Sequence, residues 1–144
     1  MRNSHRGFTL IEIMVVVVIL AVLGALVVPK ILENVDKARV TRAQSDIRAI
    51  QTALDLYRLD NFKYPTTEQG LQALVKAPAD PTITNYRSGG YLSSLPKDPW
   101  NNVYQYVSPG ADGRDYDIIT YGRDGKPGGE GYDADISTST LDSK

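Results

Sequence analysis

The sequence contains no cysteine and only one histidine, His5, which lies close to its start. Cysteine nucleophiles, Ser-His triads and the usual zinc sites need thiols or imidazoles, so a chain that loses its first residues cannot form them. The 16 basic residues are matched by 17 acidic ones, and no basic cluster is present. Phosphate binding requires a surplus of positive charge, so we expect no nucleic-acid partner. The lack of thiols and imidazoles also excludes most of the common enzyme classes.

Charged and strongly polar side chains are absent from residues 13–29. Counted from Phe8, the apolar segment reaches the roughly 20 residues that a helix needs to span a membrane. A Sec-type cleavage site after it is poor, because Leu23 occupies a position that requires a small residue. Arg2 and Arg6 precede the segment, and the positive-inside rule then places the N-terminus in the cytoplasm and exports the C-terminal part.

A single carboxylate, Glu12, lies near the start of this segment. It costs on the order of 2 to 3 kcal/mol inside a membrane helix, so such a residue usually has a partner; the alternative is a glutamate that reaches to the interface. The stretch GFTLIE, from Gly7 to Glu12, resembles the type III signal of type IV pilins and type II secretion pseudopilins. The resemblance implies that prepilin peptidase cuts after Gly7 and N-methylates Phe8. It also implies that Glu12 attracts the terminal ammonium of a neighbouring subunit during assembly.

A second helical pattern follows, in which apolar residues recur at intervals of three and four residues: Ala43, Ile47, Ile50, Leu54 and Tyr57. We expect one long helix over about residues 8–60, of which the first half is membrane-spanning and the second half packs on a domain. Thr66 and Gln69 fit a capping box that begins a short helix ending at Val75.

Two segments, residues 102–107 and 115–122, alternate like strands and are joined by a turn-rich region. The predicted fold class is α+β, with a long N-terminal helix packed on a small antiparallel β-sheet and a C-terminal loop. Four aromatic residues are candidates for a ligand-binding platform, but a small domain needs large side chains in its core, which favours a core role. They are Trp100, Tyr104, Tyr106 and Tyr116.

Most of the chain resembles the core protein G family of type II secretion, through YPTTEQGLQALV, GGYLSSLPKDPWNN, YQYVSPG and the acidic tail. The resemblance implies a type IV pilin-like fold with a cleaved basic leader at 1–7, a transmembrane and filament-core helix at 8–31, and a periplasmic domain at 32–144. Asn101 stands where the family often has glycine. Asparagine tolerates left-handed backbone angles, so we expect the turn to be kept.

An acidic, glycine-rich loop near the C-terminus contains Asp124, Glu130, Asp133 and Asp135. These carboxylates repel one another unless a cation or water screens them, and calcium accepts about 6 to 8 oxygen ligands in flexible geometry. Composition alone leaves two possibilities open, a calcium loop and a solvated tail.

The family resemblance favours calcium as a cofactor, in a loop at about residues 121–136. The side-chain ligands it implies are Asp124, Asp133 and Asp135, with the carbonyls of Tyr121 and Lys126 as contributors. Relatives typically continue with Gly-Asn-Trp after Ile136, whereas this chain has Ser-Thr-Ser.

The function that the resemblance implies is structural. The chain polymerises into the periplasmic pseudopilus of a type II secretion system, which drives folded proteins across the outer membrane. The implied partners are further copies of the chain, minor pseudopilins, the inner-membrane secretion platform and prepilin peptidase, and the implied location is a single pass through the inner membrane.

Two alternatives to this function remain. The first is an extracellular type IV pilus, against which the missing cysteine pair counts. The second is a membrane-anchored periplasmic enzyme that uses Asp124 and Asp133 as an acid–base pair.

Overall fold

The computed structural model describes residues 7–142 of the 144-residue chain, without the side chains of Pro29 and Asp142. The predicted leader therefore lies outside the described residues, apart from Gly7. The chain divides into two compact units, Met1–Asp36 and Lys37–Lys144. Each unit is described separately.

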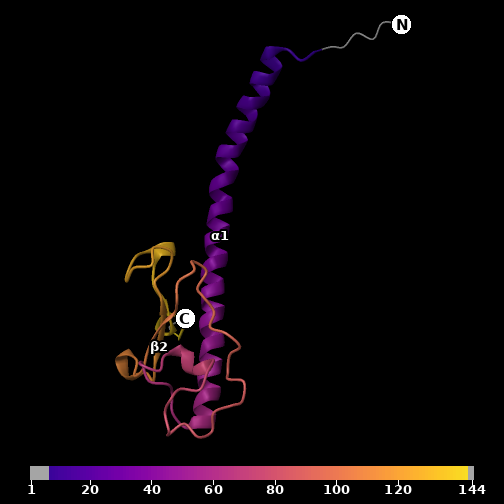
Figure 1. Ribbon diagram of the computed structural model, residues 1–144. Helices are drawn as coiled ribbons and strands as arrows, with labels where there is room; N and C mark the ends of the chain where they lie inside the picture. Colours follow the sequence, from indigo (N-terminus) through magenta and orange to yellow (C-terminus); the bar gives the residue numbers. More distant parts are fainter. Residues whose placement is uncertain (1–6, 143–144) are drawn as a thin grey trace, which may run out of the picture. The chain divides into compact units, whose positions relative to one another are not determined.

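One helix, α1, runs from Leu10 to Asn61 and belongs to both units (Figure 1). This confirms the predicted long helix. In the first unit its large apolar side chains are exposed around the whole helix, so they bury nothing within the chain. By length and composition α1 is able to cross a membrane.

The core of the second unit is built on one face of α1. The predicted stripe is confirmed, since its five residues are completely buried: Ala43, Ile47, Ile50, Leu54 and Tyr57. They pack in one cluster with buried residues from the rest of the domain: Ala53, Leu71, Ala73, Leu74, Tyr104, Tyr106, Ile118 and Ile136. Burying one leucine or isoleucine side chain stabilises the fold by about 1.5 to 3 kcal/mol, so the stripe fixes where the rest of the domain packs.

The sheet has three antiparallel strands in the order β1-β2-β3. The strands are β1 (Gln105–Val107), β2 (Asp117–Thr120) and β3 (Ile136–Ser137). Tyr106 pairs with Ile118, and Ile119 pairs with Ser137. The first two strands lie inside the predicted segments but are shorter. The third is a finding of the structure, because two residues are too few to show alternation.

Short helical turns connect these elements: η1 (Leu71–Leu74), η2 (Ala111–Gly113), η3 (Gly131–Asp133) and the single-turn helix α2 (Thr138–Asp142). The capping box is confirmed, because the Thr66 amide donates to Gln69 Oε1 at 3.0 Å and the Gln69 amide donates to Thr66 Oγ1 at 3.2 Å. The helix that follows is only the 3₁₀ turn η1, shorter than the predicted helix.

A buried carboxylate, Asp98, holds the turn that leads into the sheet. Its Oδ1 accepts hydrogen bonds from the amides of Trp100 at 3.0 Å and Asn102 at 2.7 Å, and its Oδ2 accepts one from the Thr120 hydroxyl at 2.5 Å. Asn101, between the two amides, has φ 72°. The expectation that asparagine keeps this turn in a left-handed conformation is confirmed.

We expect Asp98→Ala to lower the free energy of unfolding by about 3 kcal/mol, because it leaves the buried Thr120 hydroxyl and the two turn amides without their acceptor. Urea unfolding of the detergent-solubilised chain, followed by the fluorescence of Trp100, measures this change. The control is Glu68→Ala at an exposed site, where we expect a change within about 0.5 kcal/mol. Equal unfolding midpoints for the two variants would contradict the role of Asp98.

Candidate functional site

The first candidate site is the start of α1, where Glu12 lies in the first helical turn. Glu12 Oε2 accepts hydrogen bonds from the Thr9 amide at 2.7 Å and the Thr9 hydroxyl at 2.9 Å, and the Glu12 amide donates to Thr9 Oγ1 at 3.3 Å. This is a reciprocal capping box that begins the helix. The carboxylate thus lies at the helix N-terminus, where the macrodipole favours negative charge.

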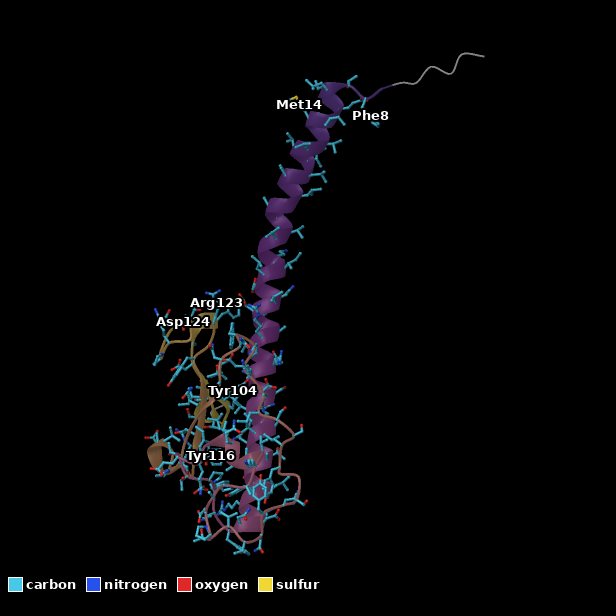
Figure 2. All side chains as sticks on the ribbon, viewed as in Figure 1. Phe8, Met14, Tyr104, Tyr116, Arg123 and Asp124 are labelled. Carbon is cyan, nitrogen blue, oxygen red and sulfur yellow. The ribbon has the colours of Figure 1, made fainter. Side chains whose placement is uncertain are left out.

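Sequence reasoning missed this use of Thr9, although the signal was present. Thr9 and Glu12 have the spacing of a capping box directly before an apolar run. Gly7 and Phe8 precede the box and are exposed, and the Phe8 side chain is 84% exposed (Figure 2). The bond between these two residues is therefore accessible from solvent.

In the first unit, Glu12 is the one ionisable side chain between Gly7 and Lys30. The large apolar side chains that follow it, as far as Leu32, are each more than half exposed. Such a surface is stable only against lipid or against other apolar helices. A carboxylate within it then needs a partner of opposite charge.

The second candidate site is the acidic loop, whose carboxylates have different partners. Asp133 forms a bidentate ion pair with Arg123, with Nε to Oδ1 at 2.8 Å and the second guanidinium nitrogen to Oδ2 at 3.0 Å. Figure 2 labels Arg123 beside Asp124, in the loop that precedes β3. Asp124 Oδ1 accepts a hydrogen bond from the Lys126 amide at 3.1 Å, which makes a local turn.

Asp135 is held on the other side of the loop, where its Oδ2 accepts a hydrogen bond from the Gly128 amide at 3.0 Å. Its Oδ1 is buried and has no hydrogen-bond partner among the described residues. The neighbouring Gly129 has φ 85°, and a Cβ there would lie 2.4 Å from the Asp133 carbonyl oxygen. Only glycine allows this approach of the two backbones.

The acidic side chains of this loop make separate contacts and are not gathered around one point in the described residues. Within residues 7–142, no group of three or more histidine, aspartate or glutamate side chains is arranged to hold a metal ion. Asp133 faces the Arg123 guanidinium, which already neutralises it, and Asp124 caps its own turn. Asp135 alone offers an unused buried oxygen. The expected ligand set, with the Tyr121 and Lys126 carbonyls, stays a prediction.

The four aromatic residues do not form a ligand platform. Tyr104 is 3% exposed and its hydroxyl donates to Asp46 Oδ2 at 3.1 Å, while Tyr106 is 8% exposed and its hydroxyl donates to the Pro65 carbonyl at 2.8 Å. Burial raises the pKa of Tyr106 to about 12, so its hydroxyl stays a neutral donor. Trp100 and Tyr116 are partly buried against the core. The predicted core role is confirmed.

A comparison with protein families assigns the chain. The family model "Type II secretion system (T2SS), protein G" matches residues 30–139, and the model "Prokaryotic N-terminal methylation motif" matches residues 2–28. The chain belongs to the protein G family of the type II secretion system. Gly7, Phe8 and Glu12 lie inside the matched methylation motif.

Curated relatives match over almost their whole length. The type II secretion system core protein G of Pseudomonas aeruginosa is 57% identical over 136 residues, which are 94% of this chain and 95% of the relative. That of Vibrio cholerae is 58% identical over 139 residues, which are 96% and 94% of the two chains. A crystal structure of the major pseudopilin of enterohaemorrhagic Escherichia coli matches with a TM-score of 0.68 and 48% identity, covering 80% of this chain and 98% of that one.

These matches decide between the alternatives. The chain is a structural pseudopilin of type II secretion with the predicted pilin-like fold, and it is not an enzyme. The methylation motif and the apolar first part of α1 fit a membrane-anchored protein. The hypothesis of an acid–base pair at Asp124 and Asp133 is therefore wrong.

Proposed function

We propose that many copies of this chain polymerise into a periplasmic pseudopilus, which drives the export of folded proteins across the outer membrane. The observation that carries this proposal is the first part of α1, which exposes apolar side chains on all sides and has one carboxylate near its start. Packed against copies of itself, this helix buries the apolar surface and gives Glu12 a partner.

The location that we propose is a single pass through the inner membrane. Residues 8–31 span the membrane before assembly and form the filament core afterwards, while residues 32–144 are the periplasmic domain. The basic residues Arg2 and Arg6 support a cytoplasmic N-terminus. Minor pseudopilins and the inner-membrane secretion platform are the proposed partners besides further copies of the chain.

Processing creates the partner for Glu12. Prepilin peptidase cuts after Gly7 and methylates Phe8, whose nitrogen then carries the terminal positive charge. In the assembled filament this ammonium pairs with Glu12 of a neighbouring copy. The carboxylate already lies at the helix start, in the capping box with Thr9, so little side-chain ordering is needed for docking.

The first prediction from this proposal concerns processing. In cells that contain the peptidase, we expect the mature chain to begin at Phe8 and to carry one added methyl group. Intact-mass spectrometry of the purified protein measures both changes together. A mature mass that still includes Met1 to Gly7 would contradict the processing claim.

The second prediction concerns the charge of Glu12. We expect Glu12→Gln to insert in the membrane but to yield at least tenfold less sedimentable filament, because a charge-assisted contact contributes about 1.5 to 3 kcal/mol. Glu12→Asp is the matched control, since it keeps the charge and retains most of the assembly. Quantitative blotting of the sheared, sedimented fraction measures the loss. Full assembly of Glu12→Gln would show that the carboxylate is dispensable.

We also propose that calcium binds the loop at about residues 121–136, through Asp124, Asp133 and Asp135 with the Tyr121 and Lys126 carbonyls. The unpartnered buried oxygen of Asp135 supports this proposal. The Arg123 guanidinium opposes it, because it occupies both oxygens of Asp133. Calcium binding therefore competes with the Arg123–Asp133 ion pair.

The third prediction follows from this competition. We expect calcium to raise the Tm of the detergent-solubilised full chain by several degrees, magnesium to raise it less, and Asp124→Ala to abolish the calcium response. Arg123→Gln releases Asp133 and should lower the Tm in chelator while enlarging the calcium response. Identical melting in calcium, magnesium and chelator, for both the natural chain and Arg123→Gln, would contradict the calcium site.

A further inference from the structure

Two large apolar side chains lie in water at the C-terminal end of α1, within the second unit. Leu59 is 71% exposed and Phe62 is 83% exposed, and we call this pair the apolar tip. It borders a surface cavity of 560 Å³ that is also lined by Asp55, Arg58 and Tyr64. By comparison, the stripe residues between positions 43 and 57 of the same helix are completely buried. The helix therefore packs on the domain through the stripe and leaves the apolar tip uncovered.

The backbone of Phe62 adds a second cost. Phe62 follows the last residue of α1 with φ 62°, and its amide donates to the Arg58 carbonyl at 2.7 Å. Glycine usually occupies this left-handed position after a helix, because a side chain there is strained. A bulky apolar residue in this conformation, with its ring in water, gains nothing within its own domain. A contact outside the domain accounts for both costs.

The rim of the tip has an excess of negative charge. The Arg58 guanidinium lies 3.3 Å from Asp115 Oδ2 and donates to the Tyr64 hydroxyl at 3.2 Å, and this hydroxyl donates to Asp55 Oδ1 at 3.0 Å. Arg58 thus pairs with Asp115, while Asp55 is connected to Arg58 only through the Tyr64 hydroxyl, so the rim holds two carboxylates and one guanidinium. A partner surface that carries a cation would balance this rim.

A second groove, formed by residues 69–79, has the complementary properties. It has a volume of 310 Å³ and its wall is formed mainly by small apolar residues with one lysine, comprising Gln69, Gln72, Ala73, Lys76, Ala77, Pro78 and Ala79. Ala77 and Ala79 are exposed, and Lys76 is the charged residue of the wall. We call it the small-residue groove.

The edge of this groove is fixed by Asp80. Its carboxylate accepts hydrogen bonds from the Thr82 hydroxyl at 2.6 Å and the Thr82 amide at 2.9 Å, and others from Gln69 and Lys63. These contacts, chiefly those from Thr82, hold the pKa of Asp80 well below its usual range. The hydrogen bond from Gln69 to Asp80 holds one wall of the groove in place before a partner binds, which lowers the ordering cost of binding.

A filament that grows from identical copies needs two different surfaces on each copy, because a self-complementary patch closes a dimer and stops growth. We propose that the apolar tip of one copy inserts into the small-residue groove of a neighbouring copy, with Lys76 facing the rim formed by Asp55, Arg58 and Asp115. This inference rests on the proposed homopolymer. It adds a contact between domains to the contact between helices.

The chain has no cysteine, which makes cysteine cross-linking a direct test. We expect full-length Phe62→Cys/Ala77→Cys to give a ladder of covalent oligomers in assembled filaments under mild oxidation. The Ala77→Cys single variant should give no ladder, because one thiol per copy can link at most two copies. A longer covalent oligomer needs two different thiols within disulfide reach. Val103→Cys/Ala77→Cys is the matched control, since Val103 is an exposed apolar residue outside the tip (59% exposed).

A second measurement does not depend on cysteine. We expect Phe62→Ser to leave the Tm of the chain unchanged or higher and to reduce sedimentable filament at least fivefold, whereas Val103→Ser should not reduce it. Lys76→Glu should also reduce it, and Asp115→Lys in the same chain should restore part of the loss. Filaments that assemble normally with Phe62→Ser, or that give no ladder with the cysteine pair, would overturn this contact. Absence of filaments from the natural chain would instead overturn the homopolymer itself.

Discussion

The second unit depends on a single apolar stripe along α1. Its five predicted positions are completely buried, and they contact residues from η1, β1, β2 and β3 in one cluster. Because the chain has no disulfide, these contacts, hydrogen bonds and ion pairs fix the loops around the helix. The same helix carries an unburied apolar surface in the first unit. One part of α1 therefore packs on the domain and faces water, whereas the other part needs lipid or neighbouring helices to cover it.

Buried polar groups also hold parts of the domain together, through hydrogen bonds between its turns and its sheet. Asp117 is 6% exposed, accepts from the Ala111 amide at 2.7 Å and the Thr138 hydroxyl at 3.0 Å, and lies 3.0 Å from Arg114 Nε. Its partners come from a turn, from α2 and from the residues before β2. The Ser-Thr-Ser stretch after Ile136 thus has a structural role, since Thr138 is buried and its hydroxyl connects α2 to β2 through Asp117.

The sequence was sufficient to predict the elements that have a periodic or local signal. The helix, its buried stripe, the Thr66–Gln69 box and the left-handed Asn101 each follow from spacing or from intrinsic preference. The strand β3 did not, because two residues carry no period. The Arg123–Asp133 ion pair was also missed, since loop pairs depend on tertiary placement and not on sequence distance. Phe62 was missed for the opposite reason, because its residue type contradicts the conformation that it adopts.

The Arg123–Asp133 ion pair has a further consequence. The two side chains are 50% and 33% exposed, so counter-ions reach the pair. Its charges lie 2.8 Å apart, well within the screening length of about 8 Å at physiological ionic strength, so added salt weakens the pair only in part. A loop closed by a disulfide opens when its surroundings become reducing. This loop has no thiol and is indifferent to redox conditions, whereas the ion pair that helps to close it loses strength as the salt concentration rises.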